Sequence, residues 1–220
     1  MNELIKRIIT SVILIIILIF SFYNNAILIL SLLLIFFQIY YEFLLIFRKI
    51  FHNRNKLILY SILFCILICL SILIFKIWLI IDSENTAEKI FLLFIISISI
   101  CSDIGGYTFG KIFKGKKISK ISPNKTYSGM IGSYILSLLF AYTLFNKYIY
   151  IDKIIIMSLL IATVTQAGDL LISYLKRKAN IKDTGVVLPG HGGLLDRFDG
   201  IIFAIPFGLL INIFLWENKL

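Results

Sequence analysis

The stretch AILILSLLLIFFQIYYEFLLIF, residues 26–47, decides the fold class. As a helix it is long enough to cross the hydrocarbon core of a bilayer, which takes about 20 apolar residues. Its only charged side chain is Glu42. Because backbone polar groups in lipid must be paired within the segment, such a run predicts a transmembrane helix.

The rest of the chain has the same apolar character. Of its 220 residues, 60% are hydrophobic, whereas soluble domains hold about 45–50%. A water-soluble protein of this length could not bury so much apolar surface. The sequence therefore predicts an all-α, polytopic integral membrane protein.

Seven apolar runs are long enough to be spans. They cover about residues 5–22, 26–47, 57–81, 90–110, 128–146, 153–175 and 199–216. The third run is long and contains Lys76, so two shorter helices there would make eight spans. The first run resembles a signal peptide, but no small-residue cleavage site follows it, which favours a retained span.

The basic residues orient these spans. With a cytoplasmic N-terminus, all Lys and Arg residues face the cytoplasm except Lys76, Lys89, Lys147, Lys153 and Lys219. Basic loops are retained in the cytoplasm, so we expect that orientation. Topology also accounts for the net charge of +10, and no nucleic-acid partner is expected, because no nucleic-acid-binding fold is visible.

Two regions differ in polar content. Residues 1–98 form N-terminal transmembrane helices, and residues 99–220 form a catalytic transmembrane region with cytoplasmic loops at 111–127 and 176–198. Any water-soluble substrate would have to be bound at these two loops.

Three acidic residues lie inside spans, where an acidic group is costly and indicates function by default. Asp103 shares a helical face with Gly106 and Gly110, where small residues let a helix or a ligand come close. Since packing alone does not need a carboxylate, we favour a function for Asp103. For Glu42, which has no surrounding motif, we favour a structural partner, such as a neighbouring Lys or a position at the helix end.

The third acid, Asp169, lies on a graded helical face. Gln166, Asp169, Ser173 and the pair Lys176 and Arg177 share this face by their spacing. The face runs from an intramembrane carboxylate to two cations at the cytoplasmic surface. Such a gradient suits a metal-bound phosphate whose remaining charge is met by Lys and Arg.

The densest polar stretch is KDTG at 182–185 followed by PGHGGLLDRFD at 189–199. Its glycines free the backbone to approach a ligand or to present N–H groups to anionic oxygen. Asp196 and Asp199 stand three apart at the start of the last span, where both would point the same way. Two carboxylates so placed form a candidate Mg²⁺ site.

The other cytoplasmic loop ends in SPNKTYSG at 122–129. Ser122 followed by Pro123 predicts a helix N-cap and first helical residue. Lys125 and Thr126 then lie near a free helix N-terminus, which is a natural phosphate-binding position.

Together these segments resemble the phosphatidate cytidylyltransferase family. The resemblance rests on SYLKR at 173–177, KD at 182–183 and PGHGGLLDRFD at 189–199, and it covers about residues 99–204. Weaker segments beginning at Asp103, Ser122 and Gln166 fall in the family's order. Ser128 stands where the family commonly has an acid, and Asn124 replaces a frequent Lys.

The resemblance implies transfer of CMP from CTP to phosphatidic acid, giving CDP-diacylglycerol and pyrophosphate for phospholipid biosynthesis. It implies Mg²⁺, with room for a second cation, at Asp103, Asp169, Asp196 and Asp199. The expected phosphate and substrate contacts are Ser122, Asn124, Lys125, Thr126, Ser173, Lys176, Arg177, Lys182, Arg197, Gly190, Gly192 and Gly193. We also place Asp183 in the catalytic set and expect His191 to shape the glycine loop or contact phosphate.

Both implied substrates are anionic phosphates, one in water and one in lipid, so the site should lie at the cytoplasmic face of a bacterial inner membrane. One alternative is a related CTP-dependent membrane enzyme acting on another lipid phosphate or a polyprenol. An ion transporter is a second alternative, since intramembrane acids also mark ion pathways. Transporters usually show repeats and broken helices at the midplane, whereas the polar groups here cluster at one face. The Gly-rich fourth span allows a homodimer.

Overall fold

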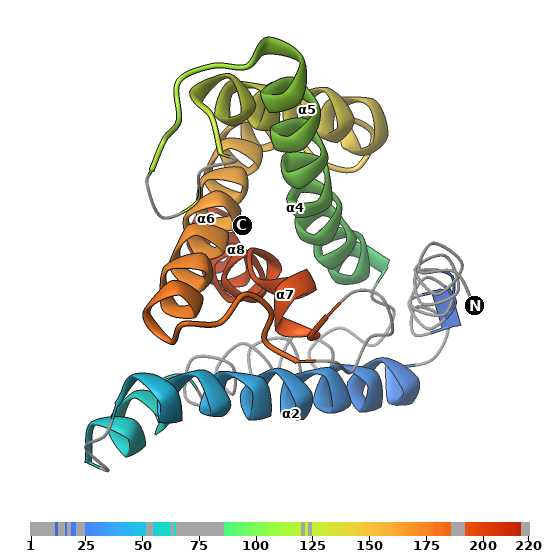
Figure 1. Ribbon diagram of the computed structural model, residues 1–220. Coiled ribbons are helices and arrows are strands. Elements are labelled where there is room, and N and C mark those ends of the chain that lie inside the picture. Colours follow the sequence, from blue (N-terminus) through green and yellow to red (C-terminus); the bar gives the residue numbers. More distant parts are fainter. Residues whose placement is uncertain are drawn as a thin grey trace. The chain divides into compact units, whose positions relative to one another are not determined.

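Figure 1 shows the computed structural model of the chain. It describes residues 12, 16, 19, 20, 25–51, 55–62, 64, 86–119, 122, 125–185 and 192–216. Within these residues the named elements are all α-helices. The chain forms two compact units: a first unit of residues 1–68 and 175–198, and a second unit of residues 69–174 and 199–220.

The first unit is built on helix α2 (Asn25–Ile50). Ile39, Phe43, Ile46 and Phe47 recur at helical spacing and are all buried. The ring of Phe43 stacks on that of Phe64, with centroids 3.7 Å apart. The opposite face of α2 is apolar too but exposed, as expected for a helix that meets lipid.

Helix α6 (Ile151–Lys178) enters the first unit with its last turn. It ends because Asn180 adopts a left-handed conformation with φ +55°. The amide of Asn180 donates to the carbonyl of Arg177, and the amide of Ile181 donates to that of Lys176. This pairing is a Schellman motif, which satisfies the last carbonyls of a helix. The chain then turns into the residues that precede the short helix α7 (Leu195–Phe198).

The second unit contains helices α4 (Thr86–Phe113) and α5 (Tyr127–Phe145), most of α6, and α8 (Ile201–Trp216) (Figure 1). Glycines bring α4 and α5 close together. A Cβ on Gly105 would lie 2.5 Å from the carbonyl oxygen of Gly132, and a Cβ on Gly132 would collide with Phe109. On the face of α4 singled out from the sequence, a Cβ on Gly106 would lie 2.9 Å from the Ser133 hydroxyl and one on Gly110 3.0 Å from that of Thr126, so the expected close approach is confirmed there as well.

Hydroxyl groups join the helices of the second unit. Ser133 of α5 donates to the carbonyl of Ser102 at 2.6 Å, and Ser137 donates to that of Ile98 at 3.2 Å. Thr165 of α6 lies 3.0 Å from the hydroxyl of Ser99. Such bonds replace the weak hydrophobic drive between helices in lipid.

Five of the expected spans are confirmed as helices. The runs at 26–47, 90–110, 128–146, 153–175 and 199–216 fall on α2, α4, α5, α6 and α8. Three described helices are long and apolar enough to cross a membrane, at Ile90–Phe113, Tyr127–Phe145 and Ile151–Lys178. The runs at 5–22 and 57–81 lie largely outside the described residues.

Two local expectations are wrong. Helix α5 begins at Tyr127 and its N-cap is Thr126, not Ser122, because the Thr126 hydroxyl accepts the amide of Gly129. The last long helix begins at Ile201, so Asp196 and Asp199 do not share its first turn. Instead Gly200 packs against Thr165, and its carbonyl accepts the amides of Phe203 and Ala204 in the first turn of α8.

Candidate functional site

The first unit holds a cluster around Asp196, one of the predicted metal ligands. Its Oδ1 accepts from Lys176 Nζ at 2.8 Å. Its Oδ2 accepts the amides of Thr184 at 2.8 Å and Gly193 at 3.0 Å. The Thr184 hydroxyl lies 3.1 Å from the same oxygen. Two amides and Lys176 therefore donate to this carboxylate, and the Thr184 hydroxyl lies beside it.

Glu42 of α2 lies in the same cluster, which the sequence did not predict. Its Oε1 accepts from Gln38 Nε2 and from the amide of Leu194, both at 2.9 Å. Its Oε2 accepts from the Thr184 hydroxyl at 2.6 Å and from the amide of Leu195 at 2.9 Å. The expected structural partner of Glu42 is therefore confirmed, but it is neither a neighbouring Lys nor a position at the helix end.

Two glycines make this arrangement possible. Gly192 has φ +84°, a conformation that other residues rarely adopt. Gly193 leaves no room for a side chain, since a Cβ would collide with Thr184 and Glu42. The glycines were predicted to allow a close ligand approach. In this structure, Gly193 allows close approach of two side chains of the protein itself.

The second unit holds another cluster, which joins two of the segments singled out from the sequence. Lys125 forms an ion pair with Asp169 of α6, and both side chains are about one quarter exposed. Ser173, one turn along α6, donates to the same carboxylate at 3.3 Å. Asp103 of α4 lies within electrostatic range of both Asp169 and Lys125. The cluster therefore places two carboxylates and one cation beside the start of α5.

The segment before α5 is held by its own hydrogen bonds. Ile118 donates its amide to the carbonyl of Lys125 at 2.9 Å, and Lys117 and Thr126 form an isolated antiparallel bridge. The Ser128 hydroxyl accepts the amide of Gly115 at 3.1 Å and lies 3.0 Å from the Thr126 hydroxyl. Ser128, the departure from the family pattern, thus helps to fix the loop that carries Lys125.

The remaining predicted residues take several positions. Arg177, Lys182, Asp183 and Arg197 are exposed in the first unit, and Ser122 is half-buried in the second. The side chain of Asp199, also in the second unit, accepts the amide of Gly200 at 3.0 Å. Asn124, Gly190 and His191 lie outside the described residues.

The described carboxylates are too dispersed to form a metal cage of their own. Among the described residues, no three or more acidic, His or Cys side chains converge on one point. Mg²⁺, however, usually takes only one or two protein carboxylates and completes its shell with water and substrate phosphates. Asp103 and Asp169 would fit such an ion if Lys125 and Ser173 released the oxygens of Asp169. Asp196 could bind one only if some of its donors moved away.

The comparisons with known proteins identify the family of the chain. The chain matches the Cytidylyltransferase family over residues 4–215, so it belongs to that family. The relatives that it resembles carry a more particular name, phosphatidate cytidylyltransferase. The protein of Rickettsia typhi is 42% identical over 144 residues, which is 61% of each chain.

Two further relatives bear the same name. The protein of Rickettsia prowazekii is 47% identical over 117 residues, which is 48% of this chain and 51% of that one. The protein of Bacillus subtilis is 41% identical over 114 residues, which is 48% of this chain and 41% of that one. The chain therefore aligns with roughly half the length of these curated relatives.

Proposed function

We propose that this protein transfers CMP from CTP to phosphatidic acid, giving CDP-diacylglycerol and pyrophosphate. The observation that carries the proposal is the contact between Lys125 and Asp169, which brings together two separate polar segments beside Asp103. Membership in the cytidylyltransferase family and the name shared by the relatives support it.

The proposed reaction is a substitution at phosphorus. A phosphate oxygen of phosphatidic acid attacks the α-phosphorus of CTP, and the bond to the β-phosphate oxygen breaks to release pyrophosphate. Because the attacking oxygen is already ionised, no strong general base is needed. The protein has to position two anions and offset their charge.

The cations and the helix end suit that task. Lys125 and Thr126 lie at the N-terminus of α5, where the helix dipole favours phosphate, while the amides of Tyr127 and Gly129 already donate to Lys116 and Thr126. We assign Ser122, Asn124 and Ser173 to substrate binding beside them. In the first unit Lys176, Arg177, Lys182 and Arg197 supply further positive charge, with Asp183, Gly190, His191, Gly192 and Gly193 completing the loop.

We propose that Mg²⁺ is required, with Asp103 and Asp169 as the best-fitting ligands. When bound, this ion supplies charge neutralisation at the transferring phosphates. Asp199 is a further candidate ligand. Asp196 is a candidate ligand only if its hydrogen bonds rearrange. A second cation is part of the same proposal.

We further propose the finer topology. The chain has seven spans, or eight if residues 57–81 form two helices. The N-terminus and the loops at 111–127 and 176–198 lie in the cytoplasm. Bacterial relatives favour an inner membrane location with the active site on the cytoplasmic face. A homodimer is also part of this proposal, through a surface other than the α4 glycines, which pack against α5 of the same chain.

A direct assay tests the reaction. Purified protein in detergent receives phosphatidic acid, α-labelled CTP and Mg²⁺, and label is followed into the lipid phase. We expect labelled CDP-diacylglycerol that disappears with EDTA and with Asp169→Asn. If folded protein labels no lipid from phosphatidic acid but labels another lipid phosphate or a polyprenol, the proposed acceptor is wrong.

A further inference from the structure

Glu42 is a buried carboxylate whose hydrogen-bond donors are all neutral groups. Its side chain is 1% exposed. Its four hydrogen-bond donors are Gln38, Thr184 and the amides of Leu194 and Leu195, and all of them are neutral. Burying a carboxylate without a cation is costly unless its acceptor positions are filled. Here they are filled, so the negative charge itself attracts and orders these donors.

The donors come from both ends of the glycine loop, which we define as residues 182–196. Thr184 lies near its beginning, whereas Leu194 and Leu195 lie near its end. The amide of Leu195 is the first of the short helix α7, and that of Leu194 immediately precedes it, where amides lack a partner within the helix. Glu42 therefore caps α7 and ties the two ends of the loop to α2.

Through Thr184 and Asp196, Glu42 is also connected to Lys176 on the predicted phosphate-binding face of α6. The Thr184 hydroxyl has one proton, and it lies 2.6 Å from Glu42 and 3.1 Å from Asp196. Donation to Glu42 is the shorter bond, which leaves Asp196 to the amides and to Lys176. A change at Glu42 would thus reach Lys176 through Thr184 and Asp196.

We infer that Glu42 is a positioning residue for the glycine loop, holding Thr184, Asp196 and Lys176 in the arrangement that turnover requires. This inference rests on the proposed function for its kinetic consequence but not for its structural one. Glu42 lies on α2, far in sequence from every motif that suggested the activity.

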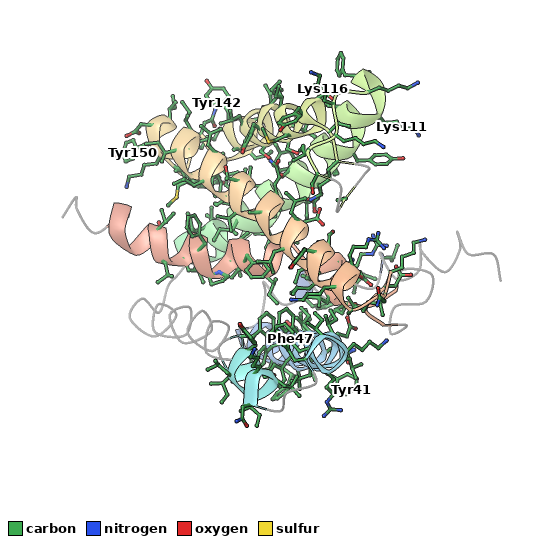
Figure 2. All side chains as sticks on the ribbon, turned by 60° about the vertical axis from the view of Figure 1, so that its left-hand side comes forward. Tyr41, Phe47, Lys111, Lys116, Tyr142 and Tyr150 are labelled. Carbon is green, nitrogen blue, oxygen red and sulfur yellow. The ribbon has the colours of Figure 1, made fainter. Side chains whose placement is uncertain are left out.

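Three variants test the inference. Glu42→Gln keeps the size of the side chain but replaces one acceptor oxygen by a donor NH₂, which then faces other donors. Thr184→Val removes the hydroxyl, and Thr184→Ser keeps it. Tyr41→Ala is the control, because Tyr41 is the neighbour of Glu42 on α2 and is 57% exposed (Figure 2).

We expect kcat per folded molecule to fall about a hundredfold in Glu42→Gln, since small misplacements of reacting groups can have effects of that order. The KM for CTP should change much less. Thr184→Val should act in the same direction, and the double variant should lose less than the product of the two effects, because both changes break one chain of contacts. Thr184→Ser and Tyr41→Ala should keep the wild-type kcat.

A second measurement does not depend on activity. Trypsin should cleave after Lys182 and Arg197 roughly tenfold faster in Glu42→Gln, because lost hydrogen bonds open the loop more often. Cleavage after Lys147 should not change. If Glu42→Gln leaves kcat and loop cleavage at wild-type values, or if its lower activity only follows a lower folded fraction, the inference is overturned. If the wild type is inactive, the proposed function fails and loop cleavage alone decides for or against positioning.

Discussion

Lys125 is the residue of the second unit to which we assign a phosphate contact. Its present partner is Asp169, and neither side chain is fully buried. A partly exposed ion pair contributes little to stability, so an incoming phosphate with several charges can compete for the cation. The pair is better suited to binding than to holding the fold together.

Lys125→Met should therefore lower kcat/KM for CTP by about a hundredfold or more, the usual loss when one positioned donor to a reacting anion is removed. Thermal stability should change little, because the pair is accessible to solvent. Lys117→Met is the matched control, since Lys117 is exposed in the same loop and only its backbone bridges Thr126. Equal activity in the two variants would rule out the phosphate role of Lys125.

Ser128 holds the loop that carries Lys125. Its hydroxyl accepts the amide of Gly115, and a buried or half-buried hydrogen bond contributes about 1 kcal/mol. In Ser128→Ala, trypsin should therefore cleave the lysines of the 111–127 loop about fivefold faster. Cleavage after Lys147 provides the internal reference. An unchanged rate would mean that Ser128 does not hold the loop.

Helix α5 packs against α4 through glycines rather than through large apolar side chains. Gly129 and Gly132 are both buried against α4, and their backbones approach it too closely for a side chain. Leu139 of the same helix is 58% exposed and faces away from the second unit's interior. The packed face of α5 is thus its small face, and its large face is left for lipid.

Gly132→Ala should consequently lower the Tm in detergent, since the added methyl group collides with Phe109 and overpacking usually destabilises by about 1–3 kcal/mol. Leu139→Ala, on the exposed face, should leave the Tm within error of the wild type. Thermal unfolding followed by circular dichroism compares the two. A larger effect for Leu139→Ala would show that the small face is not the packed one.

Local sequence patterns predicted most of the helices because a span needs only a long apolar run. They also predicted the face of α6 that carries Asp169 and Ser173, since spacing along one helix fixes it. They missed the role of Glu42, because its partners at Thr184, Leu194 and Leu195 are more than 140 residues away in sequence. No nearby residue could indicate such a contact.

The capping of α5 was missed for a different reason. Ser122 with Pro123 and Thr126 are competing start signals, and propensity alone favours the one with proline. The structure uses Thr126, because its hydroxyl reaches the Gly129 amide while Lys117 and Ser128 hold the preceding loop in place. Tertiary contacts therefore decide between two locally reasonable starts.

The two ends of the second unit carry different side chains, lysines at one end and tyrosines at the other. Figure 2 shows Lys111 and Lys116 at one end of this unit, whereas Tyr142 and Tyr150 lie toward the other. Lysines mark the cytoplasmic side of a membrane protein. Tyrosines are enriched at membrane–water interfaces, where the ring is buried and the hydroxyl stays wet. The lysine end of this unit also carries the loop with Lys125.

Cysteine labelling tests this orientation in the whole chain. In a variant whose natural cysteines are replaced by serine or alanine, Lys116→Cys and Tyr150→Cys each introduce one exposed thiol. A membrane-impermeant maleimide should label Cys at position 116 only in inside-out vesicles and Cys at position 150 only in right-side-out vesicles, because the span between them separates the two ends. Detergent should expose both, which controls for intrinsic reactivity. Labelling of both positions from one side would contradict a membrane-crossing α5, and the reverse pattern would place the Lys125 loop outside, away from cytoplasmic CTP.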